Sequence, residues 1–151
     1  EMSASLVGSE MCIRDRPYYH KVLYRDCDMM GVMNNAVYVH LMEDARVDAL
    51  SQIGCEYKGM EERGFAGPVL RLAVEYKSSA RFGDEMEVQV EFVRYTGVRL
   101  VLAYEMRDKT TGKIFATATS EHCFIGMKTG APILVRSTFP EWDKALIEAC
   151  K

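Results

Sequence analysis

The 151-residue chain lacks the features that would place it among membrane or nucleic-acid-binding proteins. No apolar run approaches the roughly 18 residues that a membrane-spanning helix needs. Nineteen basic residues against 22 acidic ones give a net charge of −3, so no basic surface for nucleic acid is expected. The N-terminus lacks the basic and then apolar layout of a secretory signal. These absences favour a cytoplasmic protein with neither a membrane nor a nucleic acid as partner.

Disulfide and metal chemistry are also poorly supported. The five cysteines are odd in number, widely scattered and form no C-x-x-C pair. The three histidines show no ligand spacing, and His122, within an alternating segment, is expected to be a hydrogen-bonded sheet residue. Scattered cysteines of this kind are typical of reduced thiols in a cytoplasm, so neither a disulfide framework nor a metal site is expected.

The length and composition suit one globular domain with a substantial core. Hydrophobic residues make up 48% of the chain and charged residues 27%, which is ordinary for a soluble protein. Residues 1–16 lack a sustained period, and 6–16 resemble the translation of a transposase adapter used to prepare sequencing libraries. We therefore assign 1–16 to a non-native leader and 17–151 to a single domain. The alternative is a genuine disordered leader.

The segment 24–46 combines an acid, a flexible turn and the start of a helix. Asp28 ends an extended stretch and is followed by a turn around Gly31. Asn34 and Asn35 are good N-cap residues, because an asparagine oxygen accepts a bond from an unpaired helix-start amide. Apolar residues then recur at helical spacing. The pattern thus places a carboxylate just ahead of a helix N-terminus, where free amides favour negative charge.

A Gly-rich connection at 54–68 ends this helix, and Gly54 supplies a natural stop. The connection suits either a flap over a site or a plain surface crossing. Alternating apolar and polar residues with hairpin turns then predict an antiparallel sheet that is solvated on one face. One long apolar helix and one curled sheet predict a two-layer α+β domain in which the sheet wraps the helix. The predicted strands cover about 18–26, 70–77, 86–92, 99–107 and 114–127, and a short amphipathic helix begins at Pro140.

The segment 24–46 resembles the signature of hotdog-fold acyl-CoA thioesterases, the group that includes 4-hydroxybenzoyl-CoA thioesterase. The likeness extends over roughly residues 17–147. It implies a hotdog fold, hydrolysis of an acyl-CoA thioester without a cofactor, and a homodimer or homotetramer with sites at the subunit interface. An exposed sheet edge independently favours pairing with a second copy. The matching residues are Asp28, Gly31, Val32-Met33, Asn34-Asn35, Tyr38 and Glu43-Asp44-Ala45-Arg46.

The resemblance assigns the catalytic carboxylate to Asp28. A carboxylate near a helix start either attacks a thioester carbonyl or deprotonates the attacking water. Amides near Asn34 and Asn35 would hold the developing oxyanion. The structural alternative is an aspartate that only caps its turn. Asn35 either orients water or substrate or simply caps the helix, and Glu43 is either a reserve catalytic acid or the i+3 partner of Arg46.

Substrate contacts are predicted around the motif and at two strand ends. The arginines among them would bind CoA phosphates, or alternatively be solvated surface charges. Many relatives with the Asn-Asn pair carry a histidine just after the glycine, where this chain has Val32, so a mechanism needing that histidine does not carry over. An acyl-carrier-protein thioesterase and a non-catalytic acyl-CoA-binding protein stay open as alternatives. The predicted contacts are Gly31, Val32, Asn34, Tyr38, Arg94 and Arg99.

Overall fold

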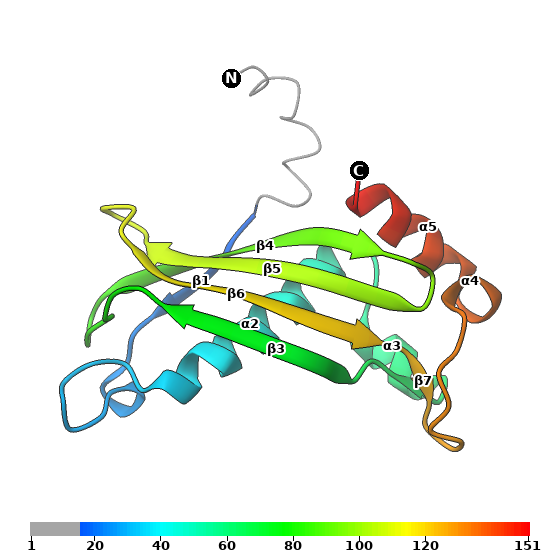
Figure 1. The fold of residues 1–151 in the computed structure, drawn as a ribbon, viewed down its shortest axis with the longest axis horizontal. Coiled ribbons are helices and arrows are strands. Elements are labelled where there is room, and N and C mark those ends of the chain that lie inside the picture. Colours follow the sequence, from blue (N-terminus) through cyan, green and yellow to red (C-terminus); the bar gives the residue numbers. More distant parts are fainter. Residues whose placement is uncertain (1–15) are drawn as a thin grey trace.

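The structure is a computed structural model that describes residues 16–151, and one long helix, α2 (Asn35–Gln52), organises it. The helix lies across one face of a curled antiparallel sheet (Figure 1). It begins after Asn34, whose side-chain oxygen accepts a hydrogen bond from the Ala36 amide at 2.9 Å. Gly54 follows its end with a φ of +88°, a conformation that glycine adopts without a Cβ clash. The predicted start and stop of this helix are confirmed.

The main sheet has five antiparallel strands in the order β1-β4-β5-β6-β3. Successive side chains alternate between its faces, so Met86, Val88 and Val90 of β4 are buried on the face that packs against α2. The core lies in this space, and β3 forms one exposed edge of the sheet. The strands are β1 (Tyr18–Lys21), β3 (Val69–Tyr76), β4 (Glu85–Tyr95), β5 (Arg99–Asp108) and β6 (Ile114–Cys123).

The first strand ends earlier than the sequence predicts. β1 stops at Lys21, and a 3-10 turn, η1 (Tyr24–Asp26), replaces the rest of the predicted strand. Asp26 causes this change, because its Oδ2 accepts hydrogen bonds from the Leu23 amide and from His20 Nε2, both at 2.8 Å. Burial alone would raise the pKa of Asp26, but these bonds and nearby charges lower it overall. The acid therefore holds the turn that leads into the segment around Asp28.

Two further connections differ from the prediction. The segment 54–68 is no plain loop, since it contains α3 (Tyr57–Glu62), anchored by the buried Met60, and the short strand β2 (Phe65–Ala66). The predicted final strand is interrupted after β6, and β7 (Ile125–Gly126) pairs with β2 in a separate two-stranded sheet. The connection is therefore structured and closes one end of the core.

The C-terminal segment forms α4 (Val135–Thr138) and α5 (Pro140–Ala149), as predicted from Pro140 onward. Trp142 and Leu146 bury one side of α5. These helices lie at the end of the sheet opposite the turn that precedes α2 (Figure 1). No helix within residues 16–151 is both long and apolar enough to cross a membrane. The proposed leader, including Cys12, lies outside the described residues except for Arg16.

Candidate active site

Asp28 stands at the start of a tight turn that leads from η1 into α2. Its Oδ1 accepts a hydrogen bond from the Met30 amide at 2.9 Å, and its carbonyl accepts one from the Gly31 amide at 2.9 Å. Gly31 has a φ of +78°, which side chains with a Cβ rarely adopt. Within residues 16–151, Oδ2 of Asp28 accepts no hydrogen bond. The side chain thus caps its turn with one oxygen and leaves the other available.

The first turn of α2 offers one unused amide beside this carboxylate. The Ala36 amide donates to Asn34 Oδ1 at 2.9 Å, and the Val37 amide donates to the Asn34 carbonyl at 3.0 Å. In the described part of the chain the Asn35 amide has no acceptor. An unused amide at the N-terminus of an 18-residue helix favours an incoming negative charge. Of the predicted oxyanion-binding amides near Asn34 and Asn35, the amide of Asn35 is therefore the candidate that remains available.

A cavity of about 380 Å³ joins Asp28 to Asn35. Tyr76, at the end of β3, donates its hydroxyl hydrogen to the Asn35 carbonyl at 2.9 Å and meets the Tyr38 ring edge to face at 5.0 Å. Burial raises the pKa of Tyr38, so its hydroxyl stays protonated at neutral pH. The other wall residues are Met30, Val32, Met33, Lys77, Ser78 and Ser79.

A second hollow of about 680 Å³ borders the same turn. Tyr24 and Phe82 meet there edge to face at 5.8 Å, and Met29 is fully exposed. Asp28 is its one charged lining residue, and Gly31 also contributes to its wall. Asp28 thus lines both a cavity rich in polar groups and a hollow whose other large side chains are Tyr24, Met29 and Phe82.

The structure brings most of the predicted site residues together, but one acid and one base of the motif, Glu43 and Arg46, lie outside the cavity. Val32 lines the cavity with its apolar side chain, and no histidine lines it in the described chain. Glu43 is exposed on α2 and does not line the cavity. The predicted ion pair between Glu43 and Arg46 is wrong, because Arg46 is 5% exposed and points into the core, where its Nη1 donates to Tyr104 Oη at 3.4 Å.

Arg46 begins a buried polar chain that sequence reasoning missed. Tyr104 Oη lies 2.7 Å from Ser120 Oγ, and Ser120 Oγ lies 2.7 Å from His122 Nε2. Burial and the charge of Arg46 lower the pKa of His122 to about 4, so the ring is neutral at neutral pH. The prediction that His122 is a hydrogen-bonded sheet residue is confirmed. One signal was present, since Arg46 falls on the same helical stripe as Met42.

The two predicted CoA-binding arginines do not line the Asp28 cavity in one protomer. Arg94 lies near the C-terminal end of β4 and Arg99 at the start of β5, whereas the cavity lies beyond the C-terminal end of β3. Arg99 Nη1 donates to Glu121 Oε2 at 2.6 Å. Their contact with CoA stays a prediction that depends on how subunits assemble.

A sheet curled around one helix, with a carboxylate beside an unused helix-start amide, is the arrangement expected of a hotdog-fold thioesterase. Comparison with known proteins agrees: the sequence profile of the thioesterase-like superfamily matches residues 22–148. This chain therefore belongs to the thioesterase-like superfamily.

Individual relatives support both the family and the fold. The Bacillus subtilis protein YneP, provisionally named an acyl-CoA thioesterase, is 30% identical over 131 residues, which are 87% of this chain and 94% of YneP. The Escherichia coli acyl-CoA thioester hydrolase YbgC is 33% identical over 81 residues, which are 54% of this chain and 60% of YbgC. The DHNA-CoA thioesterase of Staphylococcus aureus superposes with a TM-score of 0.84 at 30% identity, covering 87% of this chain and 88% of that one. The predicted hotdog fold is confirmed.

Proposed function

We propose that this protein hydrolyses acyl-CoA thioesters to a carboxylic acid and free CoA, with Asp28 as the catalytic carboxylate. One observation carries the proposal: Asp28, whose Oδ2 is unused, and Asn35, whose backbone amide is unused, line the same cavity. A thioester carbonyl placed there would have a base or nucleophile near its carbon and a hydrogen-bond donor at its oxygen. The names of YneP and YbgC support the same substrate class.

Two routes use these groups. In the first, Asp28 takes a proton from water as the water oxygen bonds to the thioester carbon, and the carbonyl electrons move onto the oxygen held by the Asn35 amide. Collapse of this intermediate breaks the C–S bond and releases the CoA thiolate, which is then protonated. In the second route Asp28 itself attacks the thioester carbon, the C–S bond breaks and the CoA thiolate leaves, and water then cleaves the resulting mixed anhydride. Single turnover in ¹⁸O-labelled water tests the second route, because label enters Asp28 only when water attacks Cγ of Asp28 in the mixed anhydride.

The two hollows beside Asp28 suggest how the substrate is oriented. The apolar hollow with Tyr24, Met29 and Phe82 suits an uncharged acyl group, because apolar surface gains free energy when it leaves water. The cavity offers hydrogen-bond donors to the amide-containing arm of CoA from Ser79 and from Lys77, which uses one of its three donors on Glu75. In this orientation the thioester lies between them at Asp28.

We further propose a homodimer that pairs β3 with β3 of a second copy. β3 is an edge strand with one unpaired side, and it exposes apolar side chains: Val69 is 46%, Leu70 46%, Leu72 38% and Tyr76 49% exposed. Such an edge favours pairing with another strand. Because Tyr76 both lies on this edge and lines the cavity, the partner would lie beside the active site. The four described cysteines form no disulfide, which suits the cytoplasmic location expected from the sequence.

A thioester panel tests the proposed reaction. Purified protein is given acyl-CoAs from acetyl through palmitoyl to an aryl-CoA, and free thiol is measured over time. Release above the uncatalysed rate with at least one substrate is expected. Tight binding without thiol release from any thioester would instead establish a non-catalytic acyl-CoA-binding protein. Equivalent acyl-carrier-protein thioesters, tested in parallel, show which carrier the enzyme prefers.

A further inference from the structure

Asp28 lies near the tip of a short hairpin formed by residues 26–34, the Asp28 hairpin. Near the tip the Asp28 amide donates to the Val32 carbonyl at 3.0 Å, and at the base the Asn34 amide donates to the Asp26 carbonyl at 2.8 Å. Each bond joins the arm that carries Asp28 to the arm that leads into α2. The position of the Asp28 carboxylate therefore depends on how the two arms are held against the rest of the fold.

The arm that leads into α2 is held by groups outside the hairpin. The Met33 amide donates to the Ala80 carbonyl at 2.8 Å, and Met33 itself is buried. The helix α2 follows directly and packs Leu41 and Met42 into the core. The Asn35 amide at the start of α2 is therefore fixed independently of the first arm.

The first arm is held through the side chain of Asp26. Asp26 is 9% exposed, and its Oδ2 accepts hydrogen bonds from His20 Nε2 of β1 and from the Leu23 amide, both at 2.8 Å. Such partners are needed because a buried carboxylate has lost its hydration. One side chain thus joins β1, the turn η1 and the Asp28 hairpin. Asp26 lines neither of the hollows beside Asp28, so it does not contact substrate in the proposed orientation.

We propose that Asp26, held by His20, is the positioning residue for the carboxylate of Asp28, an inference that rests on the proposed function. One residue separates the two acids, and this residue, Cys27, is extended with a φ of −98° and a ψ of 150°. A shift of Asp26 therefore reaches Asp28 through two rigid peptide units, with no loop between them to absorb it. A displacement of about 1 Å at a reacting group can lower turnover by roughly 10²-fold.

Single substitutions test the two side chains of this pair. Asp26→Ala leaves the Leu23 amide and His20 without their acceptor, and should lower kcat by roughly 10–100-fold while KM changes by less than about threefold. Asp26→Asn should keep kcat within about fivefold of wild type, because one amide oxygen can accept both hydrogen bonds. His20→Gln should likewise retain turnover through its side-chain amide donor, whereas His20→Ala should lose it.

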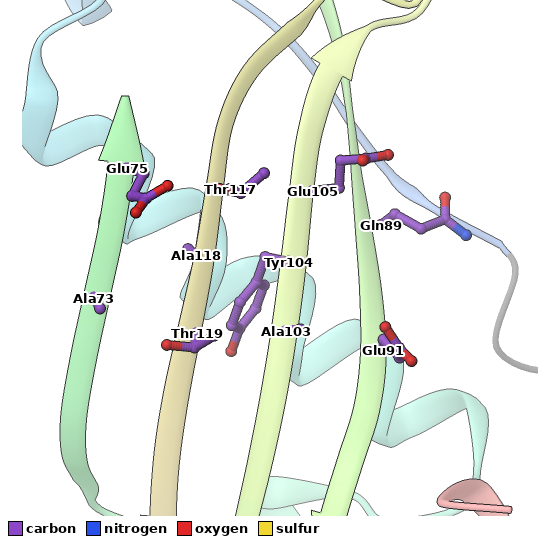
Figure 2. Close-up of a pocket in the computed structure, with 10 residues that line it drawn as sticks. All are labelled: Ala73, Glu75, Gln89, Glu91, Ala103, Tyr104, Glu105, Thr117, Ala118 and Thr119. Carbon is purple, nitrogen blue, oxygen red and sulfur yellow. The ribbon is translucent and has the colours of Figure 1, made fainter. Parts of the chain in front are cut away.

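Glu91→Ala is the control for removing a carboxylate elsewhere on the sheet. Glu91 is exposed on β4 between the buried Val90 and Phe92, so its side chain points away from α2. It borders a hollow of about 560 Å³ on that outer face, shown in Figure 2, and lines neither hollow beside Asp28. This variant should leave both kcat and KM unchanged.

A double-variant cycle with Asp28→Asn separates positioning from a general loss of structure. If Asp26 acts through Asp28, Asp26→Ala should lower the residual kcat of Asp28→Asn by less than about threefold, because the group that it positions is already inactive. The melting temperature should fall by the same number of degrees in both backgrounds. A kcat loss of equal size in both backgrounds would overturn the inference, as would wild-type kcat in Asp26→Ala.

Hydrogen exchange monitors the Asp28 hairpin independently of turnover. In Asp26→Ala the Asp28 amide should exchange at least about tenfold faster, in excess of any change at the amides of the central strand β5. Exchange at Asp28 that changes no more than exchange in β5 would overturn the inference. A wild-type protein that hydrolyses no thioester would refute the proposed function instead, and the exchange rates would still decide whether Asp26 holds Asp28 in place.

Discussion

Replacing Asp28 with asparagine removes the charge of the proposed catalytic group while keeping its shape. The amide oxygen of asparagine can still accept the hydrogen bond that the Met30 amide donates at 2.9 Å, so the turn before α2 should persist. What is lost is the anionic Oδ2, which accepts no other hydrogen bond within residues 16–151. The substitution therefore separates a role in chemistry from a role in the turn.

The expected loss in kcat is roughly 10²–10⁴-fold, the range for removing a positioned acid–base group. It corresponds to about 3–5 kcal/mol in the activation free energy. Binding of a non-hydrolysable acyl-CoA should change by less than about tenfold, or ~1.4 kcal/mol, because the Asn35 amide and the cavity walls remain. The melting temperature should hold or rise slightly, since a charge kept for chemistry is often a local cost to folding.

Steady-state thiol release, isothermal titration and a thermal melt on the same preparations measure these three quantities. Glu43→Gln is the matched control, because Glu43 is an exposed acid of the same motif that lies outside the cavity, and it should keep most turnover. Near-normal hydrolysis by Asp28→Asn combined with loss of turnover in Glu43→Gln would refute the assignment and move the chemistry to the helix acid.

The edge dimer predicts that light scattering reports at least two chains at micromolar concentration, and that Leu72→Lys on β3 shifts the protein toward monomer; a stable, active wild-type monomer would contradict it. Removal of residues 1–15 should leave both melting temperature and hydrolysis unchanged within error, whereas a clear loss of either would show that this segment packs or functions. We expect the folded protein to lose stability in acid because of His122. Folding lowers the pKa of His122 from 6.5 to about 4, so the unfolded chain binds the proton more readily. The contribution of His122 to stability is complete above pH 6.5 and falls by roughly 3 kcal/mol toward pH 4. Urea unfolding of His122→Gln should show a flatter stability profile between these pH values, and an unchanged slope would contradict the assignment.

The long helix, the four long strands and the juxtaposition of Asp28 with Asn35 were all predictable from the sequence. Each of these predictions uses local information: the spacing of apolar residues along the chain, an N-cap asparagine, or the few positions that separate Asp28 and Asn35 around Gly31. The short α3 was missed because glycines on both sides of Tyr57–Glu62 look like loop residues, and the buried Met60 that anchors it reveals itself only through packing.

The rest of the site depended on contacts between distant segments. Tyr76 and Lys77 reach the cavity from the end of β3, and no local pattern connects them to Asp28. Arg46 was paired with Glu43 because they are three positions apart on a helix, a geometry that favours ion pairs in isolation. The core overrides this local preference, since Arg46 falls on the buried side of α2 and meets Tyr104 there.

The buried chain that begins at Arg46 also determines which nitrogen of His122 carries its hydrogen. A guanidinium only donates, so Tyr104 Oη accepts from Arg46 and its own hydrogen is left for Ser120. Once Ser120 accepts from Tyr104, its own hydroxyl hydrogen is left for Nε2 of His122. This arrangement leaves the hydrogen of His122 on Nδ1, which is buried and makes no hydrogen bond within residues 16–151, and one cation on α2 orients the hydroxyls of Tyr104 and Ser120. Without the Tyr104 hydroxyl, Ser120 could turn either way and the ring could exchange tautomers.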